Sequence, residues 1–281
     1  MVRCRHDRSH RAASMMNVHF LQISDTHWSR SPIADGIDPG QRMDRLCRWI
    51  QSLDAPIDFI VHTGDLVHRG HIEGDDGSST EQVVSLLRSL PYPVHCVVGN
   101  HDHRAAWPRI LGSMPGDRLP CYRQRWAYHF QLRNERFFIL DGRDDAAIDP
   151  RGMLGEAQIE SLSSVLASTS EPATVFVHYP PLPLECDWID RTMLLIDGDE
   201  LHRVLAKHRN RVRGVFFGHV HRPVALQYEG VLYASTGGVA MHFPNLPMET
   251  SATPQSDPIA FANYVCVGDS GTLLKTQWVQ W

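Results

Sequence analysis

The strongest constraint on the fold is that five mostly apolar runs each stop at polar residues able to bind a metal ion. The runs span residues 18–23, 57–61, 94–98, 174–177 and 212–217. Their apolar and β-branched side chains predict buried β-strands. Open α/β sheets gather their sites where such strands stop and loops begin, so we expect the polar residues after the runs to lie close together.

The polar residues that follow these runs form five short segments. They are Asp25-Thr26-His27, Gly64-Asp65, Gly99-Asn100-His101-Asp102, His178 and Gly218-His219-Val220-His221. Carboxylate, imidazole and amide oxygen suit Mn, Fe or Zn, and no cysteine occurs in the five segments. Asp65 is the natural bridge because one carboxylate can give an oxygen to each of two ions. Two metals about 3.5–4 Å apart activate water and clamp phosphoryl oxygens, so the segments predict phosphate ester hydrolysis.

In this order the segments resemble the motifs of the calcineurin-like metallophosphoesterases, D-x-H, G-D, G-N-H-[DE], H and G-H-x-H. The resemblance extends from about Asn17 to about Gly238, and every ligand position agrees with it. It implies two divalent or trivalent metal ions. The first would be bound by Asp25, His27, Asp65 and His221, and the second by Asp65, Asn100, His178 and His219.

The resemblance also implies roles for two residues outside the ligand sets. His101 would face the substrate phosphate, where it stabilises charge or protonates the leaving oxygen, and Asp102 would be its orienting partner. Other histidines lie near the motifs, and we assign His68, His103 and His242 to the substrate pocket as a hypothesis, with His71 as a further neighbour. Taken singly, each is more often a solvated loop residue.

Length and composition agree with one catalytic domain, which we place at residues 17–281. A chain of 281 residues with 42% hydrophobic content can bury a large core. Residues 1–16 are rich in arginine and lack an apolar core of signal-peptide length, so we expect a disordered N-terminal extension. The net charge of −5 argues against a general nucleic-acid binder, and we expect no stable nucleic-acid complex.

The six cysteines are scattered without a CxxC pair, which favours reduced thiols over a disulfide framework. The apolar stretches are far shorter than a membrane span. We therefore expect a cytoplasmic protein that does not contact a membrane. The sequence is compatible with a homo-oligomer.

The pattern between the motifs predicts an α/β fold. Apolar residues recur at helical spacing over 43–53 before the strand at 57–63, which predicts a right-handed βαβ unit, and the spacing over 83–90 repeats it. Further elements are a hairpin at 126–140, helices at 156–166 and 199–208, and strands at 225–228, 231–235, 261–267 and 273–279. We expect a four-layer αββα sandwich of two mixed β-sheets flanked by helices. The resemblance implies the same metallo-dependent phosphatase fold.

Four irregular segments are predicted to shape the substrate pocket: 68–80, 107–122, 180–197 and 241–258. The last is rich in proline and threonine and could cap the site or mediate contacts between subunits. For each segment, a solvated connector is the alternative.

Among the substrate classes of the superfamily, a small phosphodiester is favoured. Protein Ser/Thr phosphatases resemble residues 64–70, but they carry Glu at the position of Asp102 and lack the G-H-x-H pair. The compact length, the Gly-Asn-His-Asp segment and residues 188–190 and 235–238 resemble bacterial class III cyclic nucleotide phosphodiesterases and their glycerophosphodiesterase relatives. We expect hydrolysis of a cyclic nucleotide such as cAMP, or of a glycerophosphodiester. The alternatives are a phosphomonoesterase, a protein phosphatase, or a non-catalytic interaction scaffold, which the intact ligand set disfavours.

Overall fold

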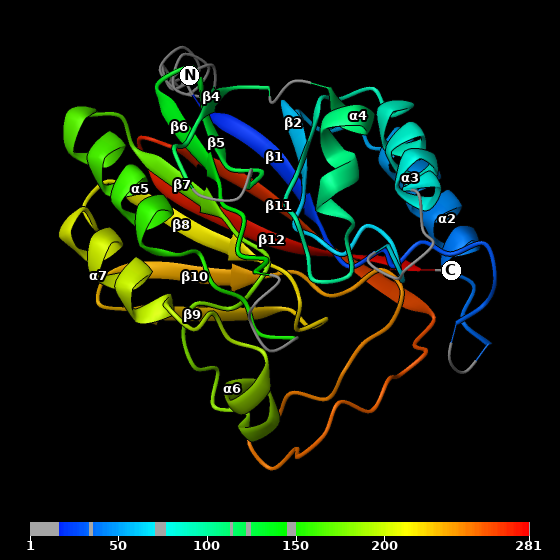
Figure 1. Cartoon of the computed structure of the whole chain (residues 1–281). Coiled ribbons are helices and arrows are strands. Elements are labelled where there is room, and N and C mark those ends of the chain that lie inside the picture. The colour runs from blue at the N-terminus through cyan, green and yellow to red at the C-terminus, as the bar shows by residue number, and fades with distance from the viewer. Residues whose placement is uncertain are drawn as a thin grey trace, which may run out of the picture.

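Two β-sheets pack face to face between outer helices in the computed structural model (Figure 1). It describes residues 17–33, 36–70, 77–112, 115–121, 125–144 and 150–280. The expected N-terminal extension at 1–16 lies outside these residues, and so does His71. No helix in the described ranges is long and apolar enough to cross a membrane.

The five-stranded sheet contains both predicted βαβ units. Its strand order is β12-β11-β1-β2-β3, with bounds Gly271–Gln280, Ile259–Gly268, Val18–Ile23, Phe59–His62 and Val94–Cys96. β1, β2 and β3 run parallel, whereas β11 is antiparallel to β1 and β12. Helices α2 (Pro39–Gln51) and α3 (Ser78–Arg88) connect the parallel strands and lie outside this sheet (Figure 1). The carboxyl ends of β1, β2 and β3 therefore share one edge.

Helix α2 shows how the sequence produces these connections. The Asp38 carboxylate accepts a hydrogen bond from the Gln41 backbone N–H at 2.9 Å, and Pro39 occupies the first turn. The buried residues recur at helical spacing and are Pro39, Met43, Leu46, Cys47 and Ile50. This apolar stripe fixes the helix against the sheet, because each large apolar side chain gains about 1.5–3 kcal/mol on burial.

The seven-stranded sheet has the order β4-β5-β6-β7-β8-β10-β9. The strands span Asp117–Arg118, Tyr128–Leu132, Glu135–Ile139, Ala173–Phe176, Val212–Phe217, Val231–Ser235 and Val224–Tyr228. β6, β7, β8 and β10 run parallel, and β5 and β6 form the predicted hairpin. Helices α5 (Glu156–Ser168) and α7 (Gly198–Lys207) lie outside this sheet (Figure 1).

An aromatic cluster joins the two sheets. The rings of Phe20 and Phe59 come from the five-stranded sheet and those of Phe137, Phe176 and Phe216 from the seven-stranded sheet, and all five are at most 2% exposed. Phe20 packs edge-on against Phe176 and Phe216, each with a centroid distance of 5.3 Å. Such pairs add about 0.5–1.5 kcal/mol each beyond the area they bury. The prediction of a four-layer sandwich is confirmed.

Three of the predicted irregular segments contain regular structure. Helix α3 begins at Ser78, inside the segment 68–80, and helix α6 (Asp187–Thr192) lies within 180–197. The segment 107–122 contains β4 and the short helix α4 (Trp107–Leu111), which follows a 3₁₀ turn at Arg104–Ala106. The proline that suggested irregularity, Pro108, lies in the first turn of α4, where a missing N–H costs nothing.

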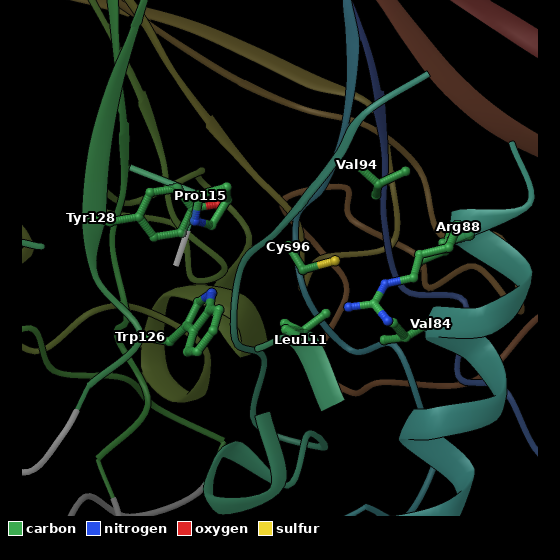
Figure 2. Close-up of a pocket in the computed structure, with 9 residues that line it drawn as sticks. Val84, Arg88, Val94, Cys96, Leu111, Pro115, Trp126 and Tyr128 are labelled. Atoms are coloured by element: carbon green, nitrogen blue, oxygen red, sulfur yellow. The ribbon is translucent and has the colours of Figure 1, made fainter. Parts of the chain in front are cut away.

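The described cysteines are all free thiols, namely Cys47, Cys96, Cys121, Cys186 and Cys266. A cavity of about 140 Å³ lies between α3, β3 and β5, and Figure 2 shows Arg88, Cys96, Leu111 and Tyr128 among the residues that line it. None of its lining residues belongs to the five polar segments. This cavity is therefore separate from the residues that carry the predicted chemistry.

Candidate metal centre

In each sheet, backbone hydrogen bonds join the polar segments that follow neighbouring strands. After β1 and β2, the N–H of Asp25 donates to the carbonyl of Gly64 and that of His27 to the carbonyl of Asp65, both at 3.0 Å. After β7 and β8, the N–H of Gly218 donates to the carbonyl of His178 at 2.9 Å. The segments meet because the carboxyl ends of parallel strands share an edge.

Several candidate ligands have an unusual backbone conformation. The φ angles lie between 42° and 69° for Asp25, His27, Asp65, His219 and His221. This left-handed region costs about 1–2 kcal/mol for a residue with a Cβ atom. Strain of this kind concentrates at functional sites, where the surrounding structure over-determines the conformation.

Two motif glycines allow the segments to approach one another. A Cβ atom on Gly64 would lie 2.3 Å from Nδ1 of His178, and one on Gly99 would lie 2.1 Å from Oδ1 of Asp65. Both distances are far below contact distance. Gly64 also has a φ of 106°, which favours glycine. The glycines in the motifs are therefore required by the packing of the candidate ligands.

The first group of candidate ligands is Asp25, His27, Asp65 and His221. One ligand atom from each lies within 4.8 Å of the others. Nε2 of His27 is 3.2 Å from Nε2 of His221 and 3.5 Å from Oδ2 of Asp65. Nε2 of His221 is 3.3 Å from Oδ1 of Asp25. These are the four residues of the predicted first set.

The second group shares Asp65 with the first. It contains Asp65, His178 and His219, again with ligand atoms within 4.8 Å of one another. Oδ1 of Asp65 is 3.4 Å from Nε2 of His178, which is 3.2 Å from Oδ1 of Asn100. The two carboxylate oxygens of Asp65 thus face different groups, Oδ2 the first and Oδ1 the second. All seven predicted ligands are brought together.

The outer ring nitrogens of three histidines are held by backbone carbonyls. Nδ1–H of His178 donates to Thr63 O at 2.7 Å, and Nδ1–H of His221 to Met241 O at 2.9 Å. Nε2–H of His219 donates to Pro150 O at 3.0 Å. Each bond turns the other ring nitrogen into the cluster, as in metal sites with outer-shell support. This buried set of nitrogen and oxygen atoms fits two cations such as Mn, Fe or Zn.

The protonation states of the buried carboxylates and histidines govern the binding of a cation. Burial lowers the pKa of His219 to about 3 and that of His27 well below its usual value, so both rings are neutral near pH 7. Burial opposes ionisation of Asp65, but the surrounding histidines, His178 first, hold the pKa of its carboxyl well below the usual range. Burial also disfavours the charged form of His178, whose pKa the Asp65 carboxylate nevertheless raises to about 9. Neutral imidazoles beside ionised carboxylates are the metal-binding forms, so a cation that binds here must displace a proton from His178.

The expectation that Asp102 orients His101 is wrong. The fully buried Asp102 carboxylate accepts hydrogen bonds from the backbone N–H groups of Leu66 and Gly99, each at 2.8 Å, and of Asp65 at 3.0 Å. It therefore supports the turns that carry Asp65 and Asn100. Nδ1–H of His101 donates instead to the backbone carbonyl of His68 at 2.6 Å.

The three histidines assigned to the substrate pocket lie in different environments. His68 is half-buried and its ring stacks on His101 with a centroid distance of 5.7 Å, so it lies at the site. His103 precedes the 3₁₀ turn and belongs to neither metal group. His242 is fully buried, and its ring nitrogens are each 3.1 Å from an oxygen, of Asp257 and of Gly238. That burial contradicts a substrate-binding role for His242, which holds the segment 241–258 in place.

Sequence reasoning missed Arg143. Its guanidinium donates to the backbone carbonyls of Asn100, at 3.0 Å, and of Asp102, on both sides of His101. Arg104 in turn donates to the carbonyl of Arg143 at 2.7 Å and pairs with Asp141. The missed signal was a sixth polar segment, 141–144, directly after a strand that runs parallel to β7.

Comparisons with known proteins agree with this geometry. Residues 18–223 match the sequence model of one protein family, calcineurin-like phosphoesterase. A probable cyclic nucleotide phosphodiesterase of Rhodopseudomonas palustris is 28% identical over 224 residues, covering 79% of this chain and 78% of that protein. A 3′,5′-cyclic adenosine monophosphate phosphodiesterase of Escherichia coli is 27% identical over 237 residues, 82% of this chain and 79% of its own. A dimetal phosphatase from Danio rerio has the same fold, with a TM-score of 0.68, 19% identity and coverage of 94% and 98%.

Proposed function

Because the chain belongs to the calcineurin-like phosphoesterase family, we propose that it is a two-metal phosphodiesterase that hydrolyses a small phosphodiester. The names of its relatives favour a 3′,5′-cyclic nucleotide as the first substrate to test. The second substrate to test is a glycerophosphodiester, which the sequence motifs suggested. The observation that carries the proposal is the Asp65 carboxylate, whose two oxygens face two separate groups of nitrogen and oxygen ligands.

Different residues of the chain would bind the cations and transfer the proton. When bound, the two cations would supply Lewis acidity for phosphoryl oxygens and a nucleophile derived from water. Asp25, His27 and His221 would hold one cation, and Asn100, His178 and His219 the other. Asp65 would fix the separation of the two, since its carboxylate is buried and its Oδ1 also accepts the His101 backbone N–H at 2.9 Å.

His101 is placed to act on the leaving oxygen. Its Nδ1–H donates to the His68 carbonyl at 2.6 Å, and we assign Nε2 to the leaving oxygen. Unlike the ligands, His101 is only partly buried, and its ring lies edge-on to that of His27 at a centroid distance of 4.7 Å. A proton held at Nε2 would stabilise developing charge and then pass to the departing alkoxide.

The charges near the site favour a diester over a monoester. Arg143 contacts the His101 turn, and its guanidinium donates to the carbonyls of Asn100 and Asp102. A dianionic monoester brings one more negative charge than a monoanionic diester. Neutralising that extra charge requires a cationic side chain directed at the phosphate.

The test compares substrates and metal states. Purified protein is assayed with bis(p-nitrophenyl) phosphate, p-nitrophenyl phosphate, 3′,5′-cAMP and a glycerophosphodiester, with added Mn²⁺ and after chelation. We expect diester hydrolysis that chelation abolishes and Mn²⁺ restores, and that Asp65→Asn reduces at least about 10²-fold. The exposed residue Asp54 provides a matched control, Asp54→Asn, with unchanged activity. Higher kcat/KM for the monoester would favour a phosphomonoesterase, and no turnover in any metal state would favour a scaffold.

A further inference from the structure

His27 differs from the other candidate histidine ligands in what lies beside its outer ring nitrogen. The outer nitrogens of His178, His219 and His221 face backbone carbonyls. Nδ1 of His27 instead lies 3.4 Å from Nδ1 of the His68 side chain. A backbone carbonyl is always an acceptor, whereas an imidazole nitrogen accepts only when it carries no proton.

Binding of a cation through Nε2 of His27 requires one tautomer of each ring. Nε2 of His27 is turned to Oδ2 of Asp65 and Nε2 of His221, so this nitrogen must carry the lone pair that would bind a cation. The proton of the neutral His27 ring is then on Nδ1 and points at His68. Nδ1 of His68 must therefore carry a lone pair, with the proton of that ring on Nε2.

The backbone of His68 is fixed on both sides, which places its ring. Its N–H donates to Trp28 O at 3.1 Å, just after the His27 position. Its carbonyl accepts a hydrogen bond from Nδ1–H of His101. Two residues later, the N–H of Gly70 donates to the carbonyl of His101 at 3.0 Å. The ring stacks on that of His101 with an interplanar angle of 16°. One residue thus contacts both a candidate ligand and the candidate acid.

We propose that His68 is a positioning residue that holds His27 in its metal-binding tautomer while its carbonyl orients His101. This inference rests on the proposed two-metal function. It assigns the side chain of His68 to the first metal group and its backbone to His101, so substitutions of the side chain should act mainly on metal binding. Removing an outer-shell partner typically lowers metal affinity about 10- to 100-fold.

Two substitutions test separately the acceptor nitrogen and the aromatic ring of His68. His68→Asn places a carbonyl oxygen near the position of Nδ1 and removes the stacked ring. His68→Phe keeps an aromatic ring against His101 and removes the acceptor. His103 is also half-buried beside the His101 turn but belongs to neither metal group, so His103→Phe is the matched control.

The experiment titrates metal-free protein with Mn²⁺ in a calorimeter, with thermal unfolding of each metal-free variant to verify folding. We expect two sites in wild type, a loss of about 10- to 100-fold in affinity at one site in His68→Phe, and nearly wild-type affinity in His68→Asn and His103→Phe. Equal affinities in wild type and His68→Phe would overturn the inference, and so would an equal loss in His68→Asn.

Two further outcomes are distinguishable. A wild-type protein with fewer than two sites would overturn the proposed function and this inference with it. A third wild-type site that disappears in His68→Phe would show that His68 is itself a ligand, in the group His27, His68 and His101, and would overturn the positioning role.

Discussion

The substitution Gly99→Ala tests whether the close packing of the two turns sets the position of Asp65. A Cβ atom at residue 99 would lie 2.1 Å from Oδ1 and 2.3 Å from the backbone nitrogen of Asp65. The clash involves backbone, so a side-chain rotation cannot relieve it. Gly99 does not have a positive φ, and the effect of the substitution is therefore steric rather than conformational.

The size of the effect follows from these distances. Ordinary carbon–oxygen contact is about 3.4 Å, so Asp65 or the Gly99 turn must shift by about 1 Å. Overpacking of this kind costs about 1–3 kcal/mol of stability. A misplacement of about 1 Å in a catalytic group costs about 10²-fold in rate. We expect both losses in Gly99→Ala, measured as free energy of unfolding in urea and as kcat/KM with bis(p-nitrophenyl) phosphate.

The control is Gly40→Ala in helix α2, where the nearest atom to an added Cβ is 3.4 Å away. Alanine is preferred to glycine in a helix, so this variant should be at least as stable as wild type and equally active. Full activity and two bound metals in Gly99→Ala would refute the reasoning, because Asp65 would then tolerate a displacement that should separate it from one group.

Three further predictions concern catalysis and pH. His101→Ala should lower kcat about 10²–10⁴-fold for an alkoxide leaving group and less for p-nitrophenolate, with metal content unchanged; equal losses would indicate a purely electrostatic role. Arg143→Ala should lower kcat/KM about 10- to 100-fold because it removes the hydrogen bonds to the carbonyls of Asn100 and Asp102. The control Arg48→Ala, at an exposed position, should leave kcat/KM unchanged. Equal activities of the two variants would show that the Arg143 hydrogen bonds are dispensable. Burial lowers the pKa of His95 to about 4, below its value of 6.5 in an unfolded chain, so the unfolded state binds more protons and stability is lost as pH falls through this window. Between pH 7.5 and pH 5, the free energy of unfolding in urea should fall by about 2 kcal/mol less in His95→Gln than in wild type. An equal fall in both proteins would refute the assignment.

The strands and the clustering of the candidate ligands could be predicted from the sequence because both follow from local patterns. Apolar runs such as 18–23 define strands, and polar residues at their carboxyl ends must lie at one edge of a parallel sheet. The pattern therefore already placed Asp25 and Asp65 at one edge of the five-stranded sheet and His178 and His219 at one edge of the seven-stranded sheet.

The roles of Asp102, His242 and Arg143 could not be predicted in this way because they depend on partners distant in sequence. Asp102 follows His101 directly, yet its carboxylate points to the N–H groups of the Asp65 turn. His242 lies near the motifs but pairs with Asp257 and is buried. Arg143 reaches Asn100 from another sheet, a contact that no spacing in the sequence records.

The most direct test of the central claim is the anomalous scattering of Mn²⁺ in crystals of the protein. Two peaks about 3.5–4 Å apart are predicted, with Oδ2 of Asp65 bound to the ion near His27 and His221 and Oδ1 bound to the ion near His178. A single peak, or two peaks that do not share Asp65, would contradict the account.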